Sequence, residues 1–299
     1  MAIYYYDLMN ALASENPEMF VRQCEESYKA SIISAAEQFL SQGKTIIMLS
    51  GPSSSGKTTT ARILMNTFRE RGFKSNIVSL DDFYFEDEDR YPRNDDGSFD
   101  FESPFALDLD LIRKDFRELI EKGCSSMPVF DFETHRRRMG ENIVTYDDHT
   151  IILVEGIHGL NPYITRTLPS DKMGKLYVSV SSRIYDRDNG IMMAKREIRL
   201  VRRLVRDYKF RNTSVDETFF AWPGVCRGEG EFIFPFRNQA DIKVDTFHPY
   251  EMCMLSEAAL EILSGAKEDF LDLRKKLKKF KQISTDLMPE DSMLHEFLG

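Results

Sequence analysis

One short run of residues carries the most specific chemical pattern in the chain. Residues 51–58 read Gly-Pro-Ser-Ser-Ser-Gly-Lys-Thr and satisfy every fixed position of the pattern G-x-x-x-x-G-K-[ST]. Glycines let such a loop curl so that successive backbone N–H groups point at phosphate oxygens, and the N-terminus of a following helix adds partial positive charge. The pattern predicts a site for the phosphates of a nucleoside triphosphate, with kinase, ATPase, GTPase and binding-switch interpretations all open at this point.

Individual residues of this loop have expected parts in binding. Lys57 would bridge the β- and γ-phosphates of ATP, and the hydroxyl of Thr58 would bind Mg²⁺. The loop residues expected to bind ATP are Gly51, Pro52, Ser53, Ser54, Ser55, Gly56, Lys57, Thr58 and Thr59.

Acidic residues follow two of the apolar runs that we expect to be strands. Asp81 and Asp82 follow one run, and Glu155 follows another. Ligands of a doubly wound sheet lie at the carboxyl ends of its strands, so these acids would lie near the phosphates. We expect Asp81 to accept the proton of an acceptor hydroxyl or to hold Mg²⁺, and Glu155 to orient Mg²⁺. The alternatives, an acidic capping turn and a strand end that faces solvent, stay open.

Arginines recur at spacings of three and four residues near position 200. The set is Arg199, Arg202, Arg203, Arg206 and Arg211. On a helix this spacing places several guanidinium groups on one face. Such a face could close as a lid over ATP and neutralise charge on the transferring phosphoryl group, and the alternative is an exposed, salt-bridged helix.

The elements that must position these residues alternate between strands and helices. The expected strands are Thr45 to Leu49, Asn76 to Leu80, Thr150 to Val154, Lys175 to Val180 and Asp241 to Val244. The expected helices between them are 57–71, 108–122 and 191–209. Continuous Ile, Val and Leu content without strict alternation favours a parallel sheet covered on both faces. We therefore predict an α/β, doubly wound, P-loop NTPase fold of about five parallel strands.

The flanking regions look helical and suggest a division of the chain. We expect an N-terminal helical extension over 1–43 that ends at Gly43, a core over 44–249 with a lid at about 191–236, and a helical segment over 250–299 packed on or trailing the core. The charged run of residues 274–281 looks like a solvated helix face. The polar stretch from Phe85 to Phe101 looks like a long surface loop.

Composition excludes several classes of function. The net charge of -9 disfavours a general nucleic-acid-binding surface. Four scattered cysteines show no spacing typical of metal ligands or of a disulfide framework. No apolar run approaches the ~18 residues of a membrane span, and we see no signal peptide. We expect a cytoplasmic protein that binds neither nucleic acid nor membrane, and a homo-oligomer stays open.

Ordered motifs from about Thr45 to Asp245 resemble the uridine kinase and phosphoribulokinase family, and uridine kinase in particular. Besides the phosphate loop, six segments resemble motifs of the family. They are residues 81–84 (family motif D-x-F-Y), 101–108 (F-D-x-P-x-A-x-D, with Glu at position 102), 128–135 (P-x-Y-D-F-x-x-H, with Phe at position 130), 155–157 (E-G-I), 199–207 (R-L-x-R-R-x-x-R-D) and 238–241 (the A-D that opens the last strand). The resemblance implies a kinase that uses ATP and Mg²⁺. The residues it implies for catalysis are Asp81, Lys57 and Arg206, for phosphate contact Arg203, Arg206 and Arg211, and for metal binding Thr58, Asp81 and Glu155.

An acceptor pocket for a nucleoside needs an apolar wall, a group for the ribose diol and a polar group for the base edge. The expected substrate-binding residues are Tyr84, Glu102, Phe130 and His135, although the aromatic side chains could equally be core and His135 a surface residue. The resemblance implies that Glu102 replaces a ribose-binding Asp, and that Phe130 and His135 contact the base.

The chain departs from the usual uridine kinase pattern in places. Phe130 stands where a Tyr is usual, and Glu102 is one methylene longer than the expected Asp. The stretch 219–235 is similar to kinase domains of longer bacterial uridine-kinase-like proteins, and we expect it to be a mobile part of the lid. We expect phosphoryl transfer from ATP to a small nucleoside-like acceptor, with uridine or cytidine first. The alternatives are another small alcohol and a nucleotide-binding regulator without catalytic activity.

Overall fold

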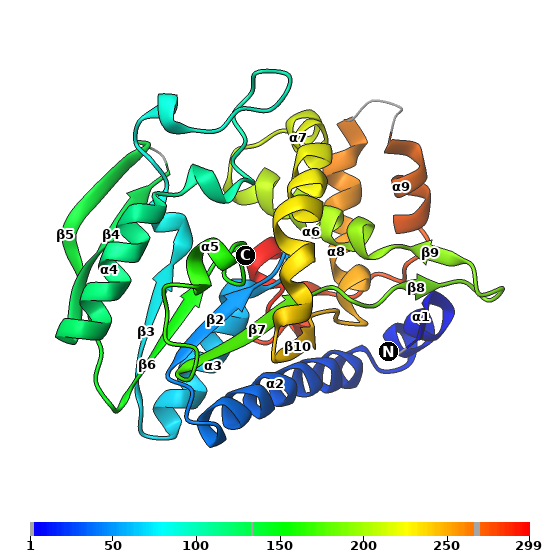
Figure 1. Ribbon diagram of the computed structural model, residues 1–299. Helices are drawn as coiled ribbons and strands as arrows, with labels where there is room; N and C mark the ends of the chain where they lie inside the picture. The colour runs from blue at the N-terminus through cyan, green and yellow to red at the C-terminus, as the bar shows by residue number, and fades with distance from the viewer. Residues whose placement is uncertain (1–2, 133, 266–269) are drawn as a thin grey trace.

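A five-stranded parallel sheet forms the centre of the structure, a computed structural model that describes residues 3–132, 134–265 and 270–299 (Figure 1). The strand order is β10-β7-β2-β6-β3. The bounds are β2 (Ile46–Ser50), β3 (Lys74–Ser79), β6 (Thr150–Glu155), β7 (Met173–Ser179) and β10 (Ile242–Asp245). These are the five strands predicted from the sequence, with ends shifted by one or two residues. The predicted α/β fold with a parallel sheet is therefore confirmed.

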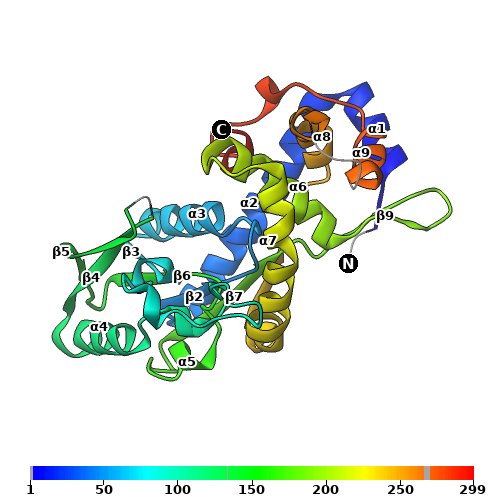
Figure 2. The same ribbon diagram turned by 90° about the horizontal axis from the view of Figure 1, so that it is seen from above.

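Helices cover both faces of the sheet, so nearly all successive residues of its central strands are buried. In β2, Ile47 and Leu49 pack into the hydrophobic cluster on one face, whereas Ile46 and Met48 pack into the cluster on the other. The first cluster takes in α2 (Pro17–Ser41), α3 (Lys57–Glu70), α6 (Lys195–Phe210) and α8 (Glu251–Ile262). The second takes in α4 (Leu109–Lys122) and α5 (Pro162–Thr165). Figure 2 shows α2 and α3 on one side of the sheet and α4 and α5 on the other.

The helix expected over 191–209 starts later than predicted. Residues Ile191–Met193 form strand β9, which pairs antiparallel with β8 (Ile184–Tyr185), and β8 pairs parallel with β1 (Tyr4–Tyr5). The backbone of Ala194 is extended, and its N–H donates to Glu197 at 2.7 Å, which caps α6. The apolar run before the helix therefore belongs to a hairpin, and the arginine-bearing part of the predicted lid begins at Lys195.

A second hairpin was not predicted from the sequence. Strands β4 (Cys124–Asp131) and β5 (Arg136–Thr145) pair antiparallel, with a register shift between Met127 and Val129. Much of β5 is exposed, so it lacks the apolar run by which a buried strand is identified. The hairpin carries the segment that was expected to contact the acceptor.

The flanking segments pack into the same hydrophobic cluster as the sheet. The N-terminal region contains α1 (Tyr6–Glu15) and α2, and Gly43 follows α2 with a φ of 66°, as expected for the residue after a helix end. Helices α9 (Leu271–Leu277) and α10 (His295–Leu298) lie near the other end of the chain. The charged run at 274–281 is more than a solvated face, because Lys276 binds Glu197 at 2.6 Å. None of the helices in the described parts of the chain is both long and apolar enough to cross a bilayer.

The stretch after α6 is helical and packed. Helix α7 (Val215–Gly228) continues into a π-helical turn (Glu229–Ile233) and a 3₁₀ turn (Phe234–Gln239). Its residues Val225, Glu229 and Ile233 are buried. The structure shows this stretch seated against the body of the protein, and its mobility as part of a lid stays a prediction.

Candidate active site

The phosphate loop connects the central strand β2 to α3, as the motif predicted. A side chain at Gly51 would collide with the carbonyl oxygen of Val178 in β7, and Gly56 has a φ of 80°, so both positions favour glycine. The Nζ of Lys57 donates to the carbonyl oxygens of Gly51 at 3.0 Å and Pro52 at 3.2 Å. Burial lowers the pKa of Lys57, while the nearby carboxylates of Glu155 and Asp81 oppose that shift. The lysine therefore lies over the loop, between it and the acids.

Two acidic side chains meet at the carboxyl ends of neighbouring strands. Asp81 lies in the turn that follows β3, and Glu155 is the last residue of β6, where it pairs in register with Ser79. The hydroxyl of Ser79 donates to Glu155 at 2.8 Å and orients it. The pKa of Asp81 is raised to about 6, first by burial and then by the charge of Glu155, while Lys57 opposes the rise. The sheet thus brings together one lysine and two carboxylates that the sequence had placed near phosphates.

Asp81 and Asp82 have different surroundings. The carboxylate of Asp82 accepts a hydrogen bond from the backbone N–H of Phe130 at 2.9 Å, which ties the β4–β5 hairpin to the end of β3. Asp81 instead faces Glu155 and Lys57. Asp82 therefore has a structural partner, while Asp81 has the charged neighbours of a reacting group.

The oxygen ligands near the loop fit Mg²⁺ bound together with nucleotide phosphates. Thr58, Asp81 and Glu155 offer a hydroxyl and two carboxylates, which are hard ligands of the kind Mg²⁺ prefers. Within the described residues, no three or more His, Cys, Asp or Glu side chains form a ready-made metal cage. Mg²⁺ commonly keeps several waters and binds through one or two carboxylates plus substrate phosphates, so the donor set suits that arrangement.

The five arginines that were expected in a lid divide into two groups. Arg199 donates to the carbonyl oxygen of Ser53 at 3.0 Å and forms a buried ion pair with Glu229. Arg202 donates to the carbonyl oxygen of Ser54 at 3.2 Å and forms a buried ion pair with Glu251. These two arginines hold the outer side of the phosphate loop.

The other three arginines gather around one buried carboxylate. Asp207 pairs with Arg203 at 3.0 Å, with Arg206 at 2.7 Å and with the more exposed Arg211 at 3.7 Å. Arg203 also donates to the hydroxyl of Ser53 at 3.1 Å, so this group reaches the phosphate loop. Three positive charges around one negative charge leave a net positive field beside the loop, which suits a polyanionic ligand.

Aromatic side chains expected at the acceptor site do cluster. The ring of Tyr84 lies 6.1 Å from that of Phe130 and 6.1 Å from that of Phe132, and the latter two lie 5.0 Å apart. The hydroxyl of Tyr84 donates to the carbonyl oxygen of Phe101 at 3.0 Å. Phe130 is buried, whereas Phe132 is 57% exposed. His135 lies exposed in the turn of the hairpin, with a φ of 52°.

Glu102 lies close to α7 and interacts with an arginine of α6. Burial raises the pKa of Glu102 to about 7, Arg203 opposes the rise, and Glu229 adds to it. A side chain at Gly228 would collide with Glu102, so α7 approaches Glu102 closely. Glu102 is therefore a carboxyl group with a pKa raised to near neutral, close to α7 and within the influence of Arg203 and Lys57.

Sequence reasoning missed two buried polar residues at this site. Glu229, fully buried, is the partner of Arg199. His158 is 2% exposed, and burial lowers its pKa to about 3, so its ring is neutral beside the backbone of Glu102 and Ser103. The only signal for His158 was its position three residues after Glu155, and nothing in the sequence marked Glu229.

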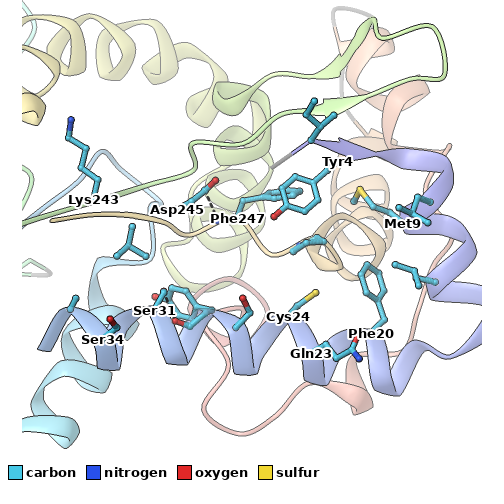
Figure 3. A pocket seen from close by; sticks show the side chains of 18 of the residues that line it. Tyr4, Met9, Phe20, Gln23, Cys24, Ser31, Ser34, Lys243, Asp245 and Phe247 are labelled. Carbon is cyan, nitrogen blue, oxygen red and sulfur yellow. Dashed lines mark hydrogen bonds between the residues drawn. The ribbon is translucent and has the colours of Figure 1, made fainter. Parts of the chain in front are cut away.

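A cavity of about 700 Å³ lies away from the phosphate loop (Figure 3). It opens between α2 and the edge strand β10. In Figure 3, Ser31 and Cys24 point into it from α2, and Tyr4 and Phe247 face them from the other side. No charged group of the site described above lines this cavity, so it is separate from the chemistry.

Comparison with known proteins places the chain among kinases. A sequence profile of the Phosphoribulokinase / Uridine kinase family matches residues 46–251. Uridine kinase of Geobacillus kaustophilus is 28% identical over 198 residues, which cover 66% of this chain and 83% of that protein. Uridine kinase of Staphylococcus haemolyticus is 27% identical over 201 residues, which cover 66% and 86%.

Among solved structures, a candidate fructose transport system kinase from Silicibacter sp. TM1040 shares the fold. Its TM-score is 0.53 at 18% identity, and the match covers 71% of this chain and 98% of that one. The profile spans well over half of the chain and includes the phosphate loop, both acids and the arginine helix. The chain therefore belongs to the phosphoribulokinase/uridine kinase family of P-loop kinases.

Proposed function

We propose that this protein transfers the γ-phosphoryl group of ATP to a hydroxyl of a nucleoside, with uridine or cytidine converted to the 5′-monophosphate. The observation that carries the proposal is the position of Asp81. It faces Lys57 of the phosphate loop and Glu155 of the neighbouring strand, and it lies three residues from Tyr84 of the aromatic cluster. A proton acceptor between a phosphate site and an aromatic wall is what a nucleoside kinase needs.

Asp81 acts as the general base in this account. Its pKa of about 6 leaves it ionised at neutral pH yet more basic than an ordinary aspartate. It takes the proton of the acceptor hydroxyl, whose oxygen forms a bond to the γ-phosphorus as the bond from that phosphorus to the ADP oxygen breaks. Lys57 and Arg206 hold the negative charge of the transferring group and of the departing ADP.

Thr58 and Glu155 would hold Mg²⁺ together with the phosphates, and Asp81 would help to hold the ion through water, so that its carboxylate stays free to take the proton. When bound, the ion would neutralise charge that builds up between the phosphates. The two carboxylates repel each other, as the rise that the charge of Glu155 causes in the pKa of Asp81 indicates. A bound cation would relieve this repulsion. Ser79 keeps Glu155 directed toward the site.

The acceptor would bind on the side of the β4–β5 hairpin. Tyr84 and Phe130 offer aromatic surface for a base, and Glu102 offers a carboxylate for the ribose hydroxyls. His135 lies at the tip of the hairpin, from which it would reach the edge of the base. Asp82 supports this arrangement because it fixes the backbone of Phe130.

A second acceptor class is favoured by one observation. Phe130 has no hydroxyl that could bind a base edge, so the wall suits an apolar or differently substituted acceptor as well as a pyrimidine. The test is a panel of nucleosides and small alcohols incubated with ATP and Mg²⁺, with products identified by mass. Phosphorylated uridine or cytidine supports the proposal. Product from a non-nucleoside alcohol alone would shift it to the second class, and acceptor-independent ADP formation would refute both.

A further inference from the structure

The residues 289–299, which we call the 289–299 segment, lie against the phosphate loop and the arginine helix. The segment contains α10, and in Figures 1 and 2 its end lies beside α6. The carboxylate of Glu296 accepts a hydrogen bond from the backbone N–H of Thr59 at 2.6 Å. The carbonyl oxygen of Leu298 accepts one from Lys209 of α6 at 2.8 Å.

The N–H that Glu296 occupies is one of those that bind phosphate in such loops. Thr59 is the third residue of α3, and the first amides of a helix have no partner within the helix. In a phosphate loop these amides cradle the α- and β-phosphates. The first turn of α3 contains no acidic residue of its own, so Glu296 supplies a negative charge at this N-terminus from a distant part of the chain.

The surroundings of Glu296 are those expected for a bound phosphate. Its charge acts on both Lys57 and Arg206, where it opposes the fall in pKa that burial causes in each. One carboxylate therefore interacts with a loop amide, the loop lysine and a lid arginine, the three kinds of group proposed to hold the triphosphate.

The segment is firmly held on both sides of Glu296, because Phe297 and Leu298 after it are buried as well. Ser292, Met293 and Leu294 are fully buried, and the hydroxyl of Ser292 contacts the buried carboxylate of Glu25 in α2. Met293 packs against Gly56 of the phosphate loop. Glu296 is only half-buried. The anchor keeps Glu296 at a high local concentration beside the loop while its side chain can leave.

We propose that Glu296 is a built-in competitor of ATP, which holds the Thr59 amide when no nucleotide does and must leave it before the triphosphate can bind fully. The inference rests on the proposed ATP site and adds a mode of regulation to it. Two anions cannot share one amide, so binding of ATP and docking of Glu296 oppose each other by the same factor in both directions. The 289–299 segment thereby sets the ATP concentration at which the enzyme becomes active.

The test compares ATP affinity in matched variants of the full chain. Glu296→Gln keeps the shape of the side chain but removes its charge, and we expect ATP to bind about tenfold more tightly, a change of about 1.4 kcal/mol. Glu290→Gln is the control, because Glu290 is exposed in the same segment and its substitution should leave the Kd unchanged. Isothermal titration calorimetry with ATP and Mg²⁺ measures both. Lys57→Ala, which should abolish binding, shows whether the ATP titrated occupies the phosphate loop.

Hydrogen exchange of the wild-type protein gives the reciprocal readout. Saturating ATP should increase exchange at residues 295 and 296, whereas the buried residues 292–294 and 297–298 should stay protected. ATP that binds through Lys57 with equal affinity in wild type and Glu296→Gln, without a change in exchange at residues 295 and 296, would overturn the inference but leave the proposed function intact. Failure of both proteins to bind ATP would overturn the proposed function, and the inference with it.

Discussion

Substitution of Asp81 by Asn should lower activity and raise stability at the same time. The pKa of Asp81 rises from 3.8 to about 6 in the folded protein, a shift of about two units. At 1.36 kcal/mol per unit, the ionised carboxylate costs the folded state up to about 3 kcal/mol. Because folding raises the pKa of this acid, the folded state is favoured where the carboxyl is protonated. That contribution to stability is present at low pH and is lost as pH rises from about 4 to about 6.

At pH 8 the free energy of unfolding of the Asp81→Asn variant should therefore exceed that of wild type by up to about 3 kcal/mol, and the variant should unfold at higher denaturant concentration. The difference should shrink toward zero near pH 4. Its kcat should fall by ~10²–10⁴, the usual contribution of a general base, while the Kd for ATP changes little. Chemical denaturation at both pH values and steady-state kinetics measure the two effects.

Asp82→Asn is the matched control for this experiment. An asparagine at this position can still accept the hydrogen bond from the N–H of Phe130, so the hairpin should stay attached and most activity should remain. Greater loss of kcat in Asp82→Asn than in Asp81→Asn would show that the base has been assigned to the wrong neighbour. An Asp81→Asn variant no more stable than wild type at pH 8 would refute the electrostatic account of the site.

Three further predictions concern charged groups around the phosphates and the acceptor. Lys57→Ala should lower phosphoryl transfer by ~10² or more, since electrostatic stabilisation is the main catalytic contribution, and wild-type turnover in a folded variant would exclude the assigned loop. Arg206→Ala should lower kcat more than it raises the KM for ATP. The control Lys275→Ala, on an exposed part of α9, should change neither constant, and equal small effects of the two substitutions would show that the arginines of α6 do not contact the transferring phosphoryl group. The pKa of Glu102 is about 7, so its carboxylate becomes ionised and better able to accept hydrogen bonds from the ribose as pH rises from 6 to 8, and the KM for the acceptor should fall. Glu102→Gln should abolish this pH dependence of KM, and a dependence that persists in the variant would belong to another group.

The sequence was sufficient to predict the sheet because its strands are buried on both faces. Runs such as Ile46 to Leu49 and Ile151 to Val154 have apolar residues at successive positions, and both faces of each are in fact covered. The phosphate loop was equally predictable, because its glycines and lysine are fixed by contacts within the loop and with the neighbouring strand.

Contacts between distant parts of the chain were the main features that could not be predicted. Helical spacing put Arg199 and Arg202 on a phosphate-binding face, but the buried acids Glu229 and Glu251 commit them to holding the loop. The β4–β5 hairpin was missed because most of β5 is exposed, so its residue pattern is that of a loop. The contact of Glu296 with α3 joins residues 237 positions apart, and no local pattern signals it.

The division of the chain into three parts stays a prediction. Residues of α2, of the sheet and of α10, such as Phe39, Leu49 and Phe297, belong to one hydrophobic cluster. We therefore propose that 1–43 and 250–299 are elaborations that fold together with the kinase core. The buried network around Glu25, which includes Tyr250 and Ser292, supports this proposal.

The central claim, direct transfer of the γ-phosphoryl group from ATP to a nucleoside hydroxyl, can be tested by isotope tracing. The protein is incubated with Mg²⁺, uridine and ATP in which the γ-phosphoryl oxygens are ¹⁸O, and the products are analysed by mass spectrometry. We predict uridine 5′-monophosphate in which the three transferred oxygens are ¹⁸O and the oxygen from the acceptor hydroxyl is not. Recovery of the label only in inorganic phosphate, with unmodified uridine, would contradict the account.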